Sequence, residues 1–117
     1  MYRLGMVGDP EIPKKLLDDI RAALLGKEAP FLRFIDGELE VKWLDEGDSR
    51  LGITRFECDH HEIYRRKRLG LPPGKVSIGL NPILKGDEAL YLHTLSHELL
   101  HAAGFLDHDG ALSLIHI

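Results

Sequence analysis

The sequence of 117 residues is poor in several features, and each shortage argues against a class of protein. Cys58 is the only cysteine, so no intrachain disulfide can form, as is usual in reducing compartments. No apolar run approaches the roughly 20 residues of a membrane-spanning helix, and residues 1–5 lack the apolar core of a secretory signal. A net charge of −4 argues against non-specific nucleic-acid binding, because phosphate contacts need a basic surface. We therefore expect a cytoplasmic protein with neither a membrane nor a nucleic-acid partner.

The length and the composition are those of one globular domain spanning residues 1–117. The chain can bury one modest core but not two. Its hydrophobic fraction of 44% and charged fraction of 29% are ordinary for such a domain. The run Arg65–Arg68 is a local basic exception, which we interpret as an exposed face.

Hydrophobic spacing in the first half predicts strands around one helix. Tyr2–Val7 is short and apolar and is predicted as a first strand. Apolar residues then recur at helical spacing after Pro13, and Gly26 is the expected end of that helix. Phe31–Ile35 and Leu39–Leu44 flank Asp-Gly, which predicts a β-hairpin.

The second half predicts two further strands and a long helix. Leu51–Phe56 is a strand candidate, whereas Cys58–Leu71 is ambiguous and is interpreted as a loop that could include a helical turn. Val76–Leu80 alternates apolar with small or polar residues, and the proline that follows suits an edge strand. A helix should begin at Asp87, run to about Ala103 and end at Gly104. These elements predict an α+β fold with a small twisted mixed sheet and two to three helices.

The most informative segment is His97-Glu98-Leu99-Leu100-His101, inside that long helix. Residues four apart lie on one helix face, so both imidazoles can approach one metal ion. The HExxH pattern is typical of zinc peptidases, in which the glutamate acts as the base for a zinc-bound water. Two such histidines can also be ordinary half-buried residues. The nearby Glu98, Gly104 and Asp107-His108-Asp109 favour a Zn²⁺ site with Glu98 as the catalytic base.

The sequence leaves two neighbouring residues, His108 and Asp107, as candidates for the third zinc ligand. A catalytic zinc keeps three protein ligands and one open position, and Gly104 would let the chain turn back after the helix. His108 is our first choice, because imidazole is the commoner ligand, and Asp107 is the alternative. His93 is not expected to share the ion, because it lies about 12 Å along the helix from His101.

The motif region resembles two groups of zinc peptidases. His97–Asp107 resembles the HExxHxxGxx(H/D) motif of metzincins, including archaemetzincins, although the only methionines, Met1 and Met6, lie far from a metzincin Met-turn. Val76–Leu84, the helix and His108-Asp109 are similar to SprT-like and minigluzincin-type minimal peptidases. Both resemblances imply a zincin-like fold, with an edge strand over the cleft and the zinc helix behind it. They leave the subfamily open.

The resemblance implies a zinc metallopeptidase that hydrolyses peptide bonds. Glu98 would take a proton from the zinc-bound water and deliver it to the leaving amine. An extended peptide or protein substrate would pair with Val76–Leu80 by strand addition. Tyr64 and Tyr91 are candidates to stabilise the developing oxyanion.

Two alternatives belong to other functional classes. The first is a zinc hydrolase of another substrate such as RNA, although a small zinc ribonuclease family with a similar helix has glycine at the position of Glu98. The second is a latent, non-catalytic zinc-binding module, in which the tail Leu112–Ile117 would enter the cleft and His116 would be a fourth ligand.

Overall fold

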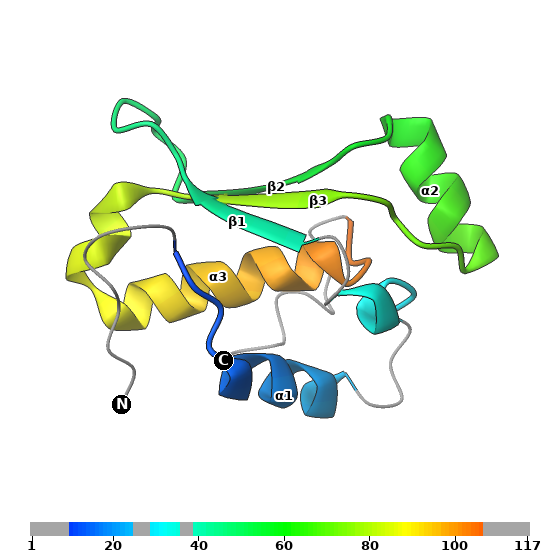
Figure 1. The fold of residues 1–117 in the computed structure, drawn as a ribbon, viewed down its shortest axis with the longest axis horizontal. Helices are drawn as coiled ribbons and strands as arrows, with labels where there is room; N and C mark the ends of the chain where they lie inside the picture. The colour runs from blue at the N-terminus through cyan, green and yellow to red at the C-terminus, as the bar shows by residue number, and fades with distance from the viewer. Residues whose placement is uncertain (1–9, 25–28, 36–38, 107–117) are drawn as a thin grey trace.

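The computed structural model describes residues 10–24, 29–35 and 39–106 (Figure 1). This part of the chain is an α+β fold with three α-helices, two short 3-10 helices and one three-stranded sheet. In chain order the elements are α1 (Lys14–Ala23), η1 (Leu32–Phe34), β1 (Leu39–Trp43), β2 (Gly52–Phe56), α2 (His60–Leu69), β3 (Val76–Leu80), η2 (Pro82–Gly86) and α3 (Glu88–Ala102). The predictions for Tyr2–Val7 and Gly26 lie outside the described residues. Within them no helix is both long and apolar enough to cross a bilayer.

The sheet is mixed, as expected, with the strand order β1-β3-β2. β3 pairs with β1 in parallel and with β2 in antiparallel orientation. Both registers include all five residues of β3, and Val76, Ile78 and Leu80 are buried. Because β3 has a neighbour on each side, the prediction that Val76–Leu80 is an edge strand is wrong. The proline that suggested an edge lies beyond the strand, in η2, where it interrupts no pairing.

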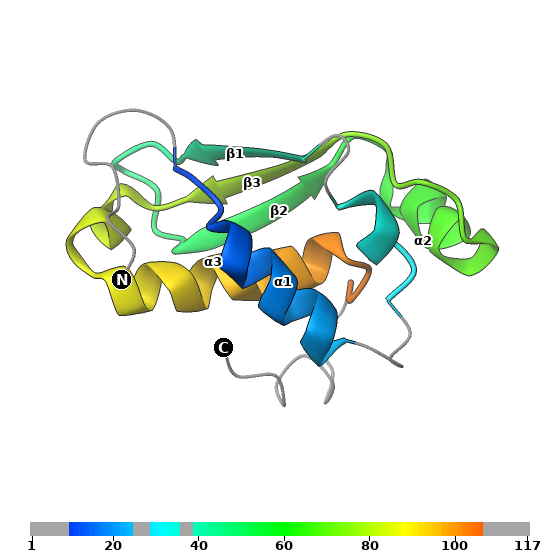
Figure 2. The same cartoon turned by 60° about the horizontal axis from the view of Figure 1, so that its bottom comes forward.

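The core lies between the sheet and α3, with α1 packed beside α3 (Figure 2). The helix that follows Pro13 is confirmed, and Leu16, Ile20 and Leu24 give it one buried face. On α3, Leu95 and Leu99 are completely buried. The long helix therefore packs an apolar face against the sheet.

The ends of α3 are defined by the residues that the sequence indicates. The Asp87 side chain accepts a hydrogen bond from the Leu90 N–H at 3.0 Å. After the helix, Gly104 has a φ of 117° and its N–H donates to the His101 carbonyl at 3.0 Å. The Phe105 N–H donates to the Leu100 carbonyl at 3.1 Å, which completes a Schellman motif. The chain thus turns sharply at Gly104, where a residue with a side chain would be strained.

The predicted hairpin is wrong. Leu32–Phe34 forms a 3-10 turn, and the Phe31 N–H donates to the Ala103 carbonyl at 3.0 Å instead of to a strand. Phe31 and Ile35, four residues apart, are both buried, which suits a helical turn against the core. Leu39–Trp43 is a strand, but its partner is β3. The Asp-Gly pair lies outside the described residues.

Cys58–Leu71 contains a ten-residue helix, α2, rather than the predicted loop. The Asp59 side chain caps it by accepting from the Glu62 N–H at 2.8 Å, and Gly70 ends it with a φ of 69°. Glu62 also pairs with Arg65 and Arg66 on the following turn. Since Ile63 is the only buried residue of α2, capping and ion pairs replace the apolar periodicity that normally identifies a helix.

Candidate active site

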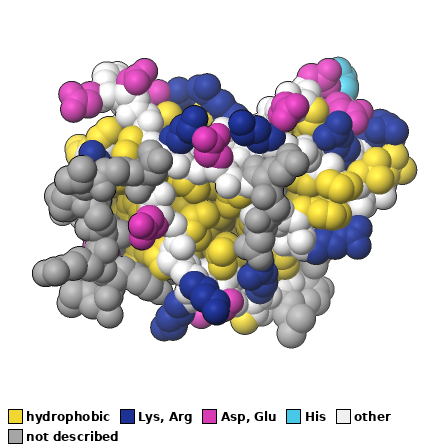
Figure 3. Space-filling model, viewed as in Figure 1, with side chains coloured by type: hydrophobic (Ala, Val, Ile, Leu, Met, Phe, Trp, Pro, Cys, Tyr) yellow, Lys and Arg dark blue, Asp and Glu magenta, His cyan; other side chains and the backbone are white. Residues whose placement is uncertain are grey.

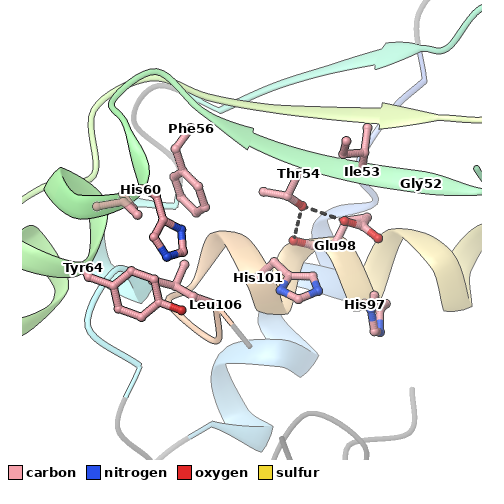
Figure 4. A pocket seen from close by; sticks show the side chains of 11 residues that line it. Gly52, Ile53, Thr54, Phe56, His60, Tyr64, His97, Glu98, His101 and Leu106 are labelled. Carbon is pink, nitrogen blue, oxygen red and sulfur yellow. Dashed lines mark hydrogen bonds between the residues drawn. The ribbon is translucent and has the colours of Figure 1, made fainter. Parts of the chain in front are cut away.

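A cavity of about 450 Å³ lies where β2, α2 and α3 meet (Figure 4). All three residues of the HExxH pattern that carry chemistry line it, together with residues of the two other elements. From α3 come His97, Glu98 and His101, from β2 Gly52, Ile53, Thr54 and Phe56, from α2 His60, Ile63 and Tyr64, and Leu106 follows α3. The structure therefore brings the predicted base and two predicted ligands to one concave site.

His97 and His101 lie one helical turn apart on the same side of α3. Their ring centroids are 4.9 Å apart with an angle of 79° between the rings. Both side chains are half-buried at the cavity wall. Two adjacent imidazoles that face a cavity are a suitable donor pair for a divalent transition metal.

The His101 ring is oriented by the turn that ends its helix. Its Nδ1 lies 2.6 Å from the Phe105 carbonyl oxygen. A carbonyl can only accept, so Nδ1 carries the proton and, in the neutral ring, Nε2 has the lone pair. A histidine that binds a metal through one nitrogen usually donates from the other to a carbonyl or carboxylate. The residues present therefore fit a bound Zn²⁺.

Glu98 is buried and is held by the neighbouring strand. Its side chain is 7% exposed, and the Thr54 hydroxyl lies 2.8 Å from Oε1 and 3.0 Å from the Glu98 carbonyl oxygen. The hydroxyl has one proton, which these two acceptors share. Figure 4 shows Thr54 above Glu98 with both contacts. The carboxylate thus has a defined position beside His97 and His101.

Gly52 allows β2 to lie close to α3 at this point. A Cβ atom there would lie 2.9 Å from Thr94 Cγ2 and 3.1 Å from Glu98 Cγ. Both distances are shorter than ordinary contacts between carbon atoms. Any larger residue would therefore push the strand away from the helix or displace Glu98.

The two tyrosine candidates for oxyanion stabilisation lie in different places. Tyr64 lines the cavity from α2, with its ring 4.8 Å from that of His60. Tyr91 is buried in the core, packs on Trp43 and donates to the Glu11 carbonyl at 2.6 Å. Burial raises the pKa of Tyr91, which opposes its ionisation. Tyr91 does not line the cavity, so the suggestion that it acts there is wrong.

Of the remaining histidine and aspartate candidates, His93 lies within the described residues, whereas Asp107 and His108 do not. His93 is exposed and does not line the cavity, in agreement with its exclusion. Across residues 10–24, 29–35 and 39–106 no three His, Cys, Asp or Glu side chains are grouped to hold a metal. Asp107 and His108 lie outside that part, so the third ligand stays a prediction.

Thr54, Gly52 and the Phe105 carbonyl belong to the site, but the sequence predicts no catalytic or metal-binding role for them. Thr54 lies on a predicted strand next to Arg55, the only exposed residue of β2, which is a weak local signal for its inward position. Comparisons with protein-family models, with curated proteins and with solved structures find no match to this chain. The chemistry of the cavity therefore carries the functional interpretation.

Proposed function

We propose that the protein is a zinc-dependent metallopeptidase with a zincin-like fold. The observation that carries this proposal is that His97, Glu98 and His101 line one cavity beneath β2, with the carboxylate held by Thr54. His97 and His101 would hold Zn²⁺ with His108, or alternatively Asp107, as third ligand. When bound, zinc would lower the pKa of a coordinated water and polarise the scissile carbonyl.

Glu98 would serve as the general base and acid of the reaction. It accepts a proton from the attacking water and delivers it to the amine that leaves the substrate. A carboxylate that moves a proton twice must keep its position between the two transfers. The hydrogen bond from Thr54 and the burial of the side chain support this role.

The substrate would bind along β2 rather than along Val76–Leu80. β3 uses both of its edges inside the sheet, whereas β2 is an outer strand of the described sheet. Its main chain can therefore pair with an extended peptide. Because β2 also lines the cavity, a peptide on its edge would lie beside Glu98. An antiparallel outer strand above an HExxH helix also supports the zincin-like assignment.

The proposal is tested by zinc content and by hydrolysis of denatured casein in the same samples. We expect wild type to contain zinc and cleave casein, and His101→Ala to lose both. Glu98→Gln should retain zinc and lose about 10²- to 10⁴-fold in rate, the usual contribution of general acid–base catalysis. His93→Ala is the matched control, because it removes an exposed imidazole from the same helix.

Three results would contradict the proposal: wild-type protein without zinc in excess zinc, full activity of Glu98→Gln, or cleavage of a structured RNA but not of casein. The last result would favour the alternative hydrolase. Zinc bound without turnover of either substrate would favour a latent zinc module. Zinc content of His108→Ala and Asp107→Ala identifies the third ligand.

A further inference from the structure

Positive charge is concentrated on α2, which forms one wall of the cavity. The helix contains four cationic residues, Arg65–Arg68, and one carboxylate, Glu62, which gives it a charge of +3. The whole chain has a charge of −4, so the residues outside α2 carry −7. Figure 3 shows Lys and Arg side chains on the part of the surface that α2 occupies in Figure 1, with Asp and Glu side chains at its upper end. A cationic wall on an acidic protein can select a ligand by its charge.

Two of the four cations are already engaged within the helix. Glu62 accepts from Arg65 at 3.1 Å and from Arg66 at 2.8 Å. Arg66 also donates to the Pro73 carbonyl at 3.2 Å. Lys67 and Arg68 form no ion pair with any residue that the structure describes. These two cations are therefore the ones available to a ligand.

Lys67 and Arg68 continue the side of α2 that lines the cavity. Lys67 follows His60 by seven residues and Tyr64 by three, so it lies on the same helix face as both. Arg68 follows Tyr64 by four residues and lies at the border of that face. The distance along the helix from His60 to Lys67 is about 10 Å. Tyr64, which also lines the cavity, lies only about 4.5 Å from Lys67 along the helix, so the two charges are about one to four residues of extended peptide from the cavity lining.

The direction of β2 determines which part of a bound peptide would meet α2. β2 runs from Gly52 beside Glu98 to Phe56, and α2 begins four residues later, at His60. Antiparallel pairing is slightly more stable than parallel pairing and would run a peptide in the opposite direction. The N-terminal part of the peptide would then lie at the Phe56 end, next to α2.

We propose that the site selects peptides with acidic side chains on the N-terminal side of the scissile bond, which Lys67 and Arg68 bind. This selectivity rests on the proposed peptidase function. A short acidic segment needs only a local cationic wall, whereas a nucleic acid would also meet the charge of −7 on the rest of the chain. Cations in the last turn of a helix also stabilise that helix. This explains why the residues are positively charged, but not why they lie on the side of α2 that lines the cavity.

The first test compares three peptides that share one cleavable centre. They carry three aspartates before the centre, three after it, or serines at both positions. We expect kcat/KM at low salt to be about three- to tenfold higher for the first peptide than for the serine peptide, as for two exposed ion pairs. The preference should disappear near 1 M salt, where the Debye length is about 3 Å.

Substitutions then assign the preference to α2. In Lys67→Gln/Arg68→Gln the ratio of the first peptide to the serine peptide should fall to about one. Lys14→Gln/Lys15→Gln is the matched control, because it changes the net charge equally through two exposed residues of α1, away from the cavity. This control should keep the preference. Circular dichroism verifies that both variants are folded, and the salt series on wild type gives the same answer without any substitution.

Binding of the same peptides to Glu98→Gln, measured by fluorescence anisotropy, separates selectivity from catalysis. Tighter binding of the first peptide without any peptide cleavage by wild type would support the cationic wall and contradict the peptidase function. Cleavage with no acidic preference, or with preference for aspartates after the centre, would overturn the inference alone. Tighter binding of a single-stranded oligonucleotide than of any peptide would overturn it in favour of a nucleic-acid ligand.

Discussion

Gly52→Ala tests whether the close approach of β2 and α3 positions Glu98. The new Cβ would lie 2.9 Å from Thr94 Cγ2 and 3.1 Å from Glu98 Cγ. Optimal carbon–carbon separations begin at about 3.5 Å, so the overlaps are about 0.6 and 0.4 Å. Thr94 is 6% exposed and β-branched, so its methyl group cannot easily rotate away. The strand or the Glu98 side chain must therefore move.

The expected effects follow from these overlaps. An extra methyl group in a packed region usually costs about 1–3 kcal/mol in the free energy of unfolding. A displacement of about 1 Å at a reacting group can cost about 10²-fold in rate, so we expect kcat/KM on casein to fall about 10- to 100-fold. Zinc content should not change, because the atoms nearest to the new Cβ belong to Thr94 and Glu98 and not to His97 or His101.

Gly86→Ala is the matched control for this substitution. Nothing lies within 4 Å of a Cβ at Gly86, and its φ is not positive. It should leave casein hydrolysis unchanged and stabilise the fold by up to about 1 kcal/mol. Urea unfolding and casein turnover measure both variants. If Gly52→Ala unfolds at the wild-type urea concentration and keeps wild-type turnover, the contact between strand and helix does not determine the position of Glu98.

Three further predictions concern the site and α2. Thr54→Val should lower the free energy of unfolding by about 1–3 kcal/mol and slow casein hydrolysis, because a buried Glu98 oxygen loses its donor, whereas Thr54→Ser should retain most of both. Removing zinc with a chelator should lower the melting temperature, and adding zinc should restore it, because zinc would bind the folded state more tightly than the unfolded chain; an unchanged melting temperature would contradict a resident zinc. The hydrogen bond from Arg66 is the main reason that the pKa of Glu62 lies below 4.5, so this carboxylate stabilises the fold at neutral pH and stops doing so as the pH falls below 4.5. Melting curves of Glu62→Gln should therefore differ from those of wild type most at neutral pH, and a difference that grows in acid would refute this.

The elements that could be predicted from the sequence are those with strong local signals. The helices Lys14–Ala23 and Glu88–Ala102 have apolar faces, and Asp87 and Gly104 define the ends of the second. Strand pairing could not be predicted in the same way. The parallel partner of β1 begins 37 residues later in the sequence, so no local pattern indicates it. The Asp-Gly pair predicted that β1 would pair with Phe31–Ile35. Those residues instead form a 3-10 turn, and the Phe31 N–H donates to the Ala103 carbonyl after α3.

The site was predictable only where one element contains its residues. His97, Glu98 and His101 lie within five residues of one helix, so their spacing alone places them together. Thr54 reaches Glu98 from 44 residues away, and only the packing of β2 on α3 makes this contact. The wall formed by α2 was missed because capping and ion pairs, rather than an apolar face, hold that helix.

The turn after α3 links a distant segment to the His101 nitrogen that would bind the proposed zinc. Pro30 lies against Gly104, at 2.9 Å from the position of a Cβ there, and the next residue, Phe31, donates to the Ala103 carbonyl. These contacts hold the chain in the direction that brings the Phe105 carbonyl to His101. If the proposed zinc site exists, replacing Pro30 by a residue that packs less closely would weaken its affinity from about 70 residues away in sequence, without changing any proposed ligand. Selection for metal binding would then act on the connection between α1 and β1 as well as on the helix that carries the histidines.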